Sequence, residues 1–152
     1  MPLGVVHPIA VHLHIALFTM GFISMYYWFF KGLVTSVFEN YLHDLAHYNT
    51  LAGVVFLVVA MATGIRDGMA GIITSFGPPL GRWLYIKAGL AFFTLAVYLV
   101  FLLKSNQKRR YLQEDSRLLF WCLGTQALGF LLMVATTAIG TMIVYYPSLL
   151  AG

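Results

Sequence analysis

The sequence predicts an all-α fold, an integral membrane bundle of four antiparallel helices. Of its 152 residues, 61% are hydrophobic and 9% are charged, so the chain has too little polar surface for a water-soluble domain. Four apolar segments each meet the roughly 20-residue length of a membrane-spanning helix. The connections between them are short, so consecutive helices should be antiparallel neighbours. We therefore expect one domain covering residues 1–152.

The four apolar segments run over residues 8–30, 42–65, 83–103 and 118–146. The first lacks the basic start and the small-residue cleavage site of a signal peptide, so we expect it to be retained. Tryptophan and tyrosine side chains gather near the segment ends, as in the aromatic belt of a membrane protein. The members of this predicted belt are Trp28, Trp83, Trp121, Tyr26, Tyr27, Tyr145 and Tyr146.

Positive charge is unequally shared between the two ends of the predicted bundle. One end carries six basic residues, namely Lys31, Lys104, Lys108, Arg109, Arg110 and Arg117. The other end carries Arg66 and Arg82, with Lys87 just inside the third segment. The positive-inside rule then predicts that the six-residue end lies in the cytoplasm and that both termini lie outside. The charge is too localised for a nucleic-acid surface, so we expect no nucleic-acid partner.

Three of the five histidines lie in the opening stretch "VHPIAVHLHI", residues 6–15. At 100° per residue, His7 and His14 share one helix face, whereas His12 lies roughly 140–160° from both. At most two of the three can therefore address one site. One interpretation is that His7 lies in the wet interface while another histidine bonds to a neighbouring helix. The other is axial ligation of a tetrapyrrole by a neutral imidazole.

The other two histidines lie in "YLHDLAHYN", residues 41–49, near the predicted cytoplasmic end. His43 and His47 are four residues apart on one helix face. Their Cβ atoms should be roughly 5–6 Å apart, too close for the two axial ligands of one porphyrin. Three interpretations remain open: a second cofactor or a quinone, a divalent metal with Asp44 as third ligand, or a solvated helix extension with wet polar groups.

A b-type haem is the cofactor that these histidines favour, although its ligand pairing is difficult. If the first two helices cross the bilayer in register, His14 lies level with a residue between about 53 and 62. At about 1.5 Å per residue, His47 is then about 9 Å or more from that level. The second ligand would come from a displaced helix, a methionine or another subunit. A chlorophyll-type pigment, which needs one protein ligand, is the alternative.

Two short motifs connect the chain to a known family. "HPIAVH", residues 7–12, and "ATGIRDG", residues 62–68, together resemble the small bacterial membrane proteins grouped as domain of unknown function 2231. The resemblance depends on His7, Pro8, Val11, His12 and Asp67. It implies a four-helix membrane architecture. Some relatives are joined to cytochrome-like domains, which implies redox chemistry. His14 departs from the pattern, because a proline commonly occupies that place.

These observations favour a membrane subunit of a respiratory or photosynthetic complex, with other subunits and the lipid bilayer as partners. It would bind haem for transmembrane or quinone-linked electron transfer, and the candidate ligands are His7, His12, His14, His43 and His47. The alternative is an accessory or scaffold subunit that binds a chlorophyll-type pigment or lipid. A small transporter ranks third, because the ionisable residues lie at the helix ends. The five acids form no paired catalytic site, and a lone Cys122 makes no disulfide, so we expect no catalysis by the chain alone.

Overall fold

The computed structural model describes residues 6–67 and 78–146, and the side chains of residues 6–66 and 81–146. Within these ranges the chain is helical, with short turns. The long helices are α1 (Val6–Thr35), α2 (Asn40–Asp67), α4 (Pro78–Gln107) and α5 (Ser116–Tyr145), and a short 3-10 turn, η3 (Leu112–Glu114), precedes α5. Each long helix is long and apolar enough to cross a membrane. The predicted all-α four-helix architecture is confirmed.

The helix ends have local causes in the sequence. Ser36 takes a positive φ of 55°, a conformation that stops a right-handed helix, and α1 ends one residue earlier. Asp115 caps α5, because its carboxylate accepts a hydrogen bond of 3.1 Å from the Leu118 N–H. The turn between α1 and α2 is joined by an ion pair of 2.5 Å between Lys31 and Glu39. These features make both turns at this end compact.

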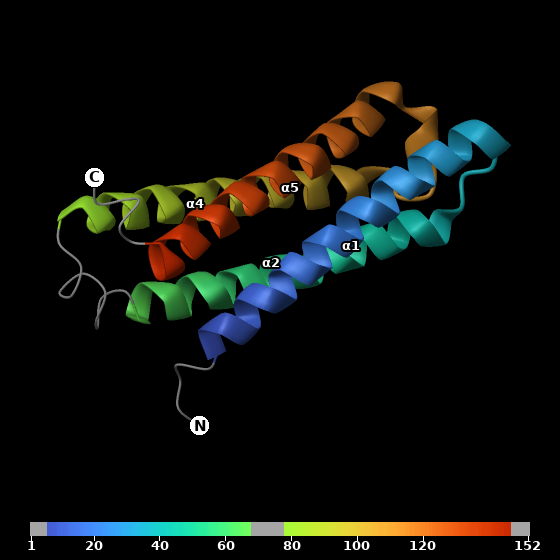
Figure 1. Ribbon diagram of the computed structural model, residues 1–152. Coiled ribbons are helices and arrows are strands. Elements are labelled where there is room, and N and C mark those ends of the chain that lie inside the picture. Colours follow the sequence, from blue (N-terminus) through green and yellow to red (C-terminus); the bar gives the residue numbers. More distant parts are fainter. Residues whose placement is uncertain (1–5, 68–77, 147–152) are drawn as a thin grey trace.

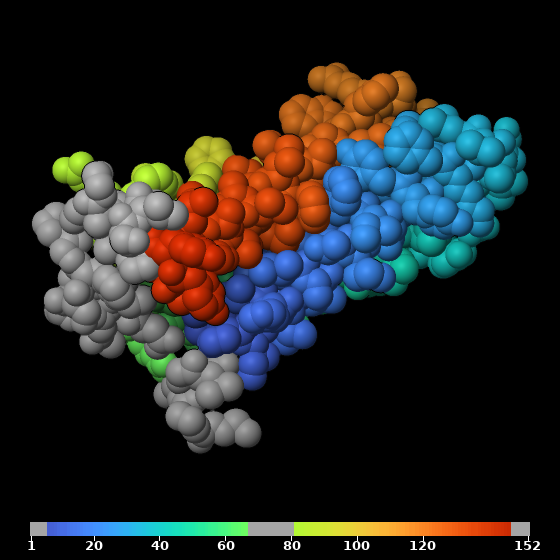
Figure 2. All heavy atoms as spheres, in the orientation of Figure 1, coloured from blue at the N-terminus to red at the C-terminus, as the bar shows by residue number. Residues whose placement is uncertain are grey.

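The helices form two antiparallel hairpins, α1 with α2 and α4 with α5, and contacts of α2 with α4 and of α1 with α5 close the bundle (Figure 1). Figure 2 shows α1 and α5 side by side along one face of the molecule. Helix α1 begins, and α5 ends, at one end of the bundle, which we call the terminal end. The opposite end contains the two compact turns and the six basic residues, and we call it the basic end.

Close helix contacts occur at glycines, as the small-residue rule for membrane bundles predicts. A Cβ atom at Gly21 of α1 would lie 2.8 Å from Thr50 Oγ1 of α2. A Cβ atom at Gly53 of α2 would lie 2.6 Å from the ring of Phe18. Gly124 of α5 is different, because nothing lies within 4 Å of its added Cβ position. The first two glycines therefore set the distance between α1 and α2.

The outer surface carries many large apolar side chains, as expected of a bundle whose surroundings are lipid. Tyr27, Trp121, Tyr145 and Tyr146 are exposed near helix ends, consistent with the predicted aromatic belt. Trp28 is an exception, because it is only 1% exposed and packs in the core near the basic end. The prediction that Trp28 belongs to the belt is wrong, because a residue near a helix end still points inward when it lies on the buried face.

Candidate functional site

One layer of side chains fixes the relative heights of all four helices. The ring of Phe18 on α1 stacks on Tyr98 of α4, with ring centroids 3.9 Å apart. The Tyr98 ring also covers Gly129 of α5, where an added Cβ would lie 2.8 Å from it. On the other side, Phe18 covers Gly53 of α2. Phe18, Gly53, Tyr98 and Gly129 therefore lie at one height in the bundle.

The next layer lies one helical turn closer to the terminal end. Moving four residues along each helix in that direction gives His14, Leu57, Thr94 and Met133. All four side chains are buried, with exposed fractions of 7%, 4%, 2% and 3%. An imidazole on α1 and a thioether on α5 therefore share one buried layer, on neighbouring helices of different hairpins.

The His14 ring is held by its own helix. Its Nδ1 donates a hydrogen bond of 3.0 Å to the carbonyl oxygen of Ala10, one turn earlier. The ring also meets Phe18 edge to face, with centroids 5.9 Å apart. Because the Nδ1 atom carries the proton in this bond, Nε2 keeps a lone pair. An imidazole fixed in this way is prepared to ligate a metal through Nε2.

A shallow groove of about 270 Å³ adjoins this layer on the surface. Its lining residues are Ile15, Met133, Val134, Thr137, Ala138 and Thr141, from α1 and α5. The groove is smaller than the roughly 300–1,000 Å³ of most ligand pockets, so it does not enclose a macrocycle. Met133 is one of its lining residues, so the groove lies between Met133 and the outer surface of the bundle.

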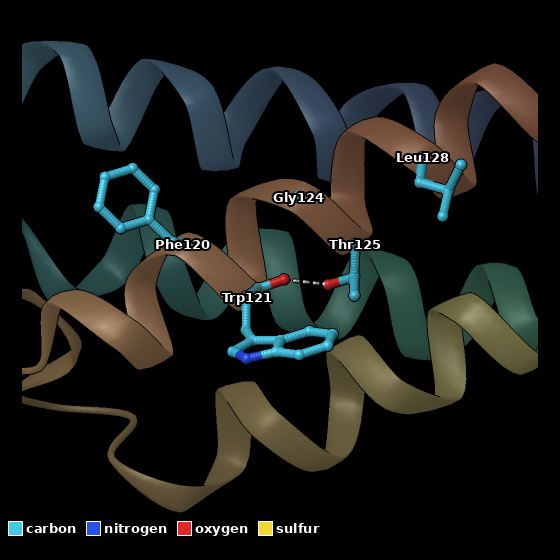
Figure 3. Close-up of a pocket in the computed structure, with 5 residues that line it drawn as sticks. All are labelled: Phe120, Trp121, Gly124, Thr125 and Leu128. Carbon is cyan, nitrogen blue, oxygen red and sulfur yellow. Dashed lines mark hydrogen bonds between the residues drawn. The ribbon is translucent and has the colours of Figure 1, made fainter.

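A second groove of about 270 Å³ is lined by α5 alone (Figure 3). Its residues are Phe120, Trp121, Gly124, Thr125 and Leu128. The Thr125 hydroxyl donates to the Trp121 carbonyl oxygen at 2.7 Å, which satisfies it within the helix. The lining contains no titratable side chain, so this groove offers surface for apolar contact and no acid–base chemistry.

The two remaining opening histidines have different surroundings. His7 Nδ1 lies 3.0 Å from the carbonyl oxygen of Ala60 and 3.1 Å from the hydroxyl of Thr63, so His7 joins the start of α1 to the end of α2. His12 is exposed, and its Nδ1 donates to the Pro8 carbonyl oxygen at 2.7 Å. The predicted rotation is confirmed, because His7 and His14 turn toward the bundle and His12 turns away from it.

The histidines of α2 near the basic end are buried. His43 is 1% exposed and His47 is 8% exposed, so the interpretation of a solvated helix extension is wrong for both rings. His47 Nδ1 shares a hydrogen bond of 2.7 Å with the Ser105 hydroxyl of α4. His43 packs against the indole of Trp28, with ring centroids 5.5 Å apart. The rings are buried because other helices cover this face of α2. Residue spacing within α2 does not reveal these contacts.

An ion pair lies beside these histidines. Asp44 Oδ1 lies 2.7 Å from Arg109 Nε, and the Arg109 guanidinium lies over the Tyr48 ring, 4.4 Å from its centroid. Hydrogen bonds to Tyr48 and to Asp44 raise the pKa of Arg109, so this residue stays charged. Among the described residues no three His, Cys, Asp or Glu side chains gather as a metal site would require. The geometry therefore gives no support to a metal held by His43, His47 and Asp44.

The distance along the helix axis between His14 and the histidines of α2 tests whether His14 and His47 can ligate one haem. His14 lies level with Leu57, inside the predicted window of residues 53–62. Leu57 is ten residues from His47 and fourteen from His43, which corresponds to roughly 15 and 21 Å along the helix axis. One haem cannot span that distance, so ligation of a single haem by His14 together with His47 is excluded. Sequence reasoning did not single out Met133 from the seven methionines, since only the register of α5 against α1 does so.

Four long apolar helices, with large apolar side chains on the outer surface and a mainly apolar core, define a polytopic integral membrane protein. The chain belongs to the family described as predicted membrane protein (DUF2231), whose model matches residues 4–149. The family match thus extends beyond the first two helices to nearly the whole chain. Asp67, one of the residues on which the resemblance depends, lies outside the described side chains. No curated protein and no solved structure matches the chain.

Proposed function

We propose that this membrane protein is an electron-transfer subunit of an energy-converting complex and that it holds a b-type haem between His14 and Met133. The single observation that carries the proposal is their presence in one buried layer, on helices of different hairpins. Imidazole and thioether form an established axial ligand pair for haem iron. When bound, the haem supplies one-electron transfer, and the protein contributes binding and orientation.

The two side chains have distinct roles in this proposal. His14 presents Nε2, because Nδ1 is occupied by the Ala10 carbonyl oxygen. Met133 presents a soft sulfur atom from α5, and a methionine ligand raises the reduction potential relative to a second histidine. Cofactor sites in helix bundles are commonly built in this way, from side chains that face one another across the core.

Space for a macrocycle must come from movement of the hairpins. The layer between His14 and Met133 is closely packed, and the neighbouring groove is too small for a porphyrin. Helices α1 and α5 belong to different hairpins and contact each other less than each contacts its hairpin partner. Parting of the two hairpins at this layer therefore disturbs less packing than opening either hairpin.

A second candidate function rests on His12. This ring is exposed on the outer surface, and its Nδ1 donates to the Pro8 carbonyl oxygen, which leaves Nε2 free to coordinate. A chlorophyll-type pigment needs one protein ligand and could lie on the lipid side, between this chain and a partner subunit. The chain would then be an accessory pigment-binding or scaffold subunit without a redox role.

The expectation of a second cofactor or a quinone at His43 or His47 stays a prediction. Neither of the two surface grooves is lined by these residues. Association with other subunits, and a location in a bacterial inner membrane with the basic end in the cytoplasm, belong to the same proposal. Gentle detergent extraction and native mass measurement test the first, since a stable cofactor-loaded monomer would contradict it.

An absorption spectrum of the purified protein, oxidised and reduced, tests the haem assignment. We expect reducible haem bands in the wild type and their loss in His14→Ala. Met133→Leu should keep the haem but change its spectrum and lower its reduction potential, because one axial ligand is removed. His12→Ala is the matched control and should leave the spectrum unchanged. A red chlorin band lost in His12→Ala would support the second candidate, and a wild type without any visible band would overturn both.

A further inference from the structure

His43 is the most completely buried histidine among the described side chains. It lies in the first turn of α2, at the basic end, in contact with Trp28 of α1. Neither ring nitrogen has a hydrogen-bond partner among the described residues, and the same is true of the Trp28 indole N–H. A buried polar atom without a partner is costly, and more so inside a membrane. Because such a group is costly, an ionisable residue buried in a membrane bundle commonly has a function that requires it.

The acceptor closest to His43 belongs to the neighbouring residue. Asp44 Oδ1 lies 3.9 Å from His43 Nδ1, beyond hydrogen-bond distance. The same oxygen atom is 2.7 Å from Arg109 Nε. The carboxylate of Asp44 thus stands between a buried neutral ring and an arginine at the rim, and it is partly exposed to solvent, with 44% of its side chain accessible. In this arrangement its Oδ1 contacts Arg109 closely and His43 only at a longer distance.

The charged or titratable groups that act on His43 are Asp44, His47 and Arg109. Asp44 and Arg109 lie toward the basic end, and His47 lies one turn deeper along α2. Asp44 and His47 belong to its own helix, and Arg109 belongs to the chain that follows α4. The contacting ring from α1 is Trp28, which does not titrate. The core cluster around them also contains Cys122 of α5. Asp44 is therefore the acid best placed to exchange a proton with the ring.

Buried polar groups continue from His43 toward the middle of the bundle. One turn along α2, His47 shares its hydrogen bond with Ser105. About one further turn along, the side-chain amide of Gln126 donates to the Thr50 hydroxyl at 2.7 Å. All four of these side chains are less than 10% exposed. A proton that reaches His43 would thus meet further polar groups in an otherwise apolar interior.

We propose that His43 is a proton-binding site inside the membrane bundle, loaded from the basic end through Asp44 and controlled by Arg109. A proton from water first bonds to the Asp44 carboxylate as Arg109 moves away. It then passes to His43 Nδ1, while Nε2 keeps its own proton, so the ring becomes an imidazolium and Asp44 is again a carboxylate. Release follows the reverse order. The site requires no cofactor, so it stands independently of the haem proposal.

Nitrogen-15 NMR of the full-length protein in nanodiscs, with labelled histidine, tests this site directly. The ring nitrogen signals distinguish neutral from doubly protonated imidazole, and His43→Gln identifies the His43 signal by its loss. Arg109→Gln removes a cation and frees Asp44, so at about pH 6 the ratio of charged to neutral His43 should rise at least about threefold. Asp44→Asn should lower the same ratio at least about threefold, because the cation stays while its anion is lost.

Lys108→Gln and Asp115→Asn are matched controls, because these two residues form another ion pair at the basic end, at 3.4 Å. Both controls should leave the His43 signal unchanged. Helical circular dichroism confirms that each variant is folded, and Arg109→Lys, which keeps the cation, should behave more like the wild type than Arg109→Gln does. A His43 ring that stays neutral at all pH values from about 4 to 8 in the wild type and in Arg109→Gln would overturn the proposal. An equal response to Asp44→Asn and Asp115→Asn would do the same.

Discussion

His14 of α1 and Met133 of α5 lie in the same buried layer, one turn from the stack of Phe18 on Tyr98. Because the two residues come from different hairpins, a ligand bound between them would join the hairpins together. The stack of Phe18 on Tyr98 holds the hairpins in register next to this layer. The aromatic layer is therefore the first place to test the packing on which the site depends.

Phe18→Ala should destabilise the bundle by roughly 1–3 kcal/mol. The loss arises from the cavity and from the missing stack on Tyr98, since transfer of a phenyl ring between lipid and protein interior contributes little. Thermal unfolding in a mild detergent, followed by circular dichroism, measures the change. Phe93→Ala is the control, because Phe93 is 67% exposed on the outer surface of α4, and it should cost much less. Equal losses in both variants would show that the aromatic layer has no special role.

Gly21→Leu should separate α1 from α2. An added Cβ atom would lie 2.8 Å from Thr50 Oγ1 and 3.3 Å from the Ala46 carbonyl oxygen, and backbone cannot move aside as a flexible side chain can. We expect a lower unfolding temperature and a smaller monodisperse fraction in size-exclusion chromatography. Gly124→Leu, where the added atom meets nothing within 4 Å, should resemble the wild type. The close contact has no structural importance if Gly21→Leu is as stable as Gly124→Leu.

Asp115→Ala should weaken the start of α5, and the loss should depend on pH. The hydrogen bond from the Leu118 N–H lowers the pKa of Asp115 below its ordinary value of 3.8, with Lys108 adding to the effect. A carboxylate with a lowered pKa in the folded state stabilises the fold above the ordinary value, and this contribution is lost as the pH falls through the lowered pKa. Unfolding curves of wild type and Asp115→Ala should therefore differ at neutral pH and converge in acid. A difference that is constant over the whole pH range would contradict a contribution from the charged carboxylate.

The basic end should face the cytoplasm. A cysteine at Asn106, which is exposed near the end of α4, should resist a membrane-impermeant thiol reagent added to intact cells and should react once the cells are permeabilised. A cysteine at Tyr146, beyond the end of α5, should react in intact cells. The native Cys122 is buried and serves as the internal background. The predicted orientation is inverted if the two positions exchange their behaviour.

Much of the fold follows from segment length and hydropathy, because a membrane leaves a chain few alternatives to long helices. Helical rotation also predicted which opening histidines turn together, and the contact of His7 with α2 agrees with it. The level of His14 relative to α2 was predicted from the register of two antiparallel helices. Leu57, the residue that lies level with it, is inside the predicted window of residues 53–62. These successes concern properties of one helix, or of two helices joined by a short turn.

The failures concern contacts between distant helices. His43 and His47 were open to a solvated interpretation because "YLHDLAHYN" is polar at a helix start, yet Trp28 and Ser105 cover these rings from other helices. Met133 is one of seven methionines, and no local pattern distinguishes it from the rest. Only the contact of Gly129 with Tyr98 brings Met133 to the height of His14.

Four polar links join the two hairpins within the basic half of the bundle. They are Asp44 with Arg109, His47 with Ser105, Thr50 with Gln126, and the Tyr26 hydroxyl with the Leu123 carbonyl oxygen. These four links are the natural pivot for any rotation of one hairpin against the other. For a rotation about this pivot, displacement grows with distance from the basic end. A small angular change at the Arg109 side therefore moves the terminal end by the largest amount.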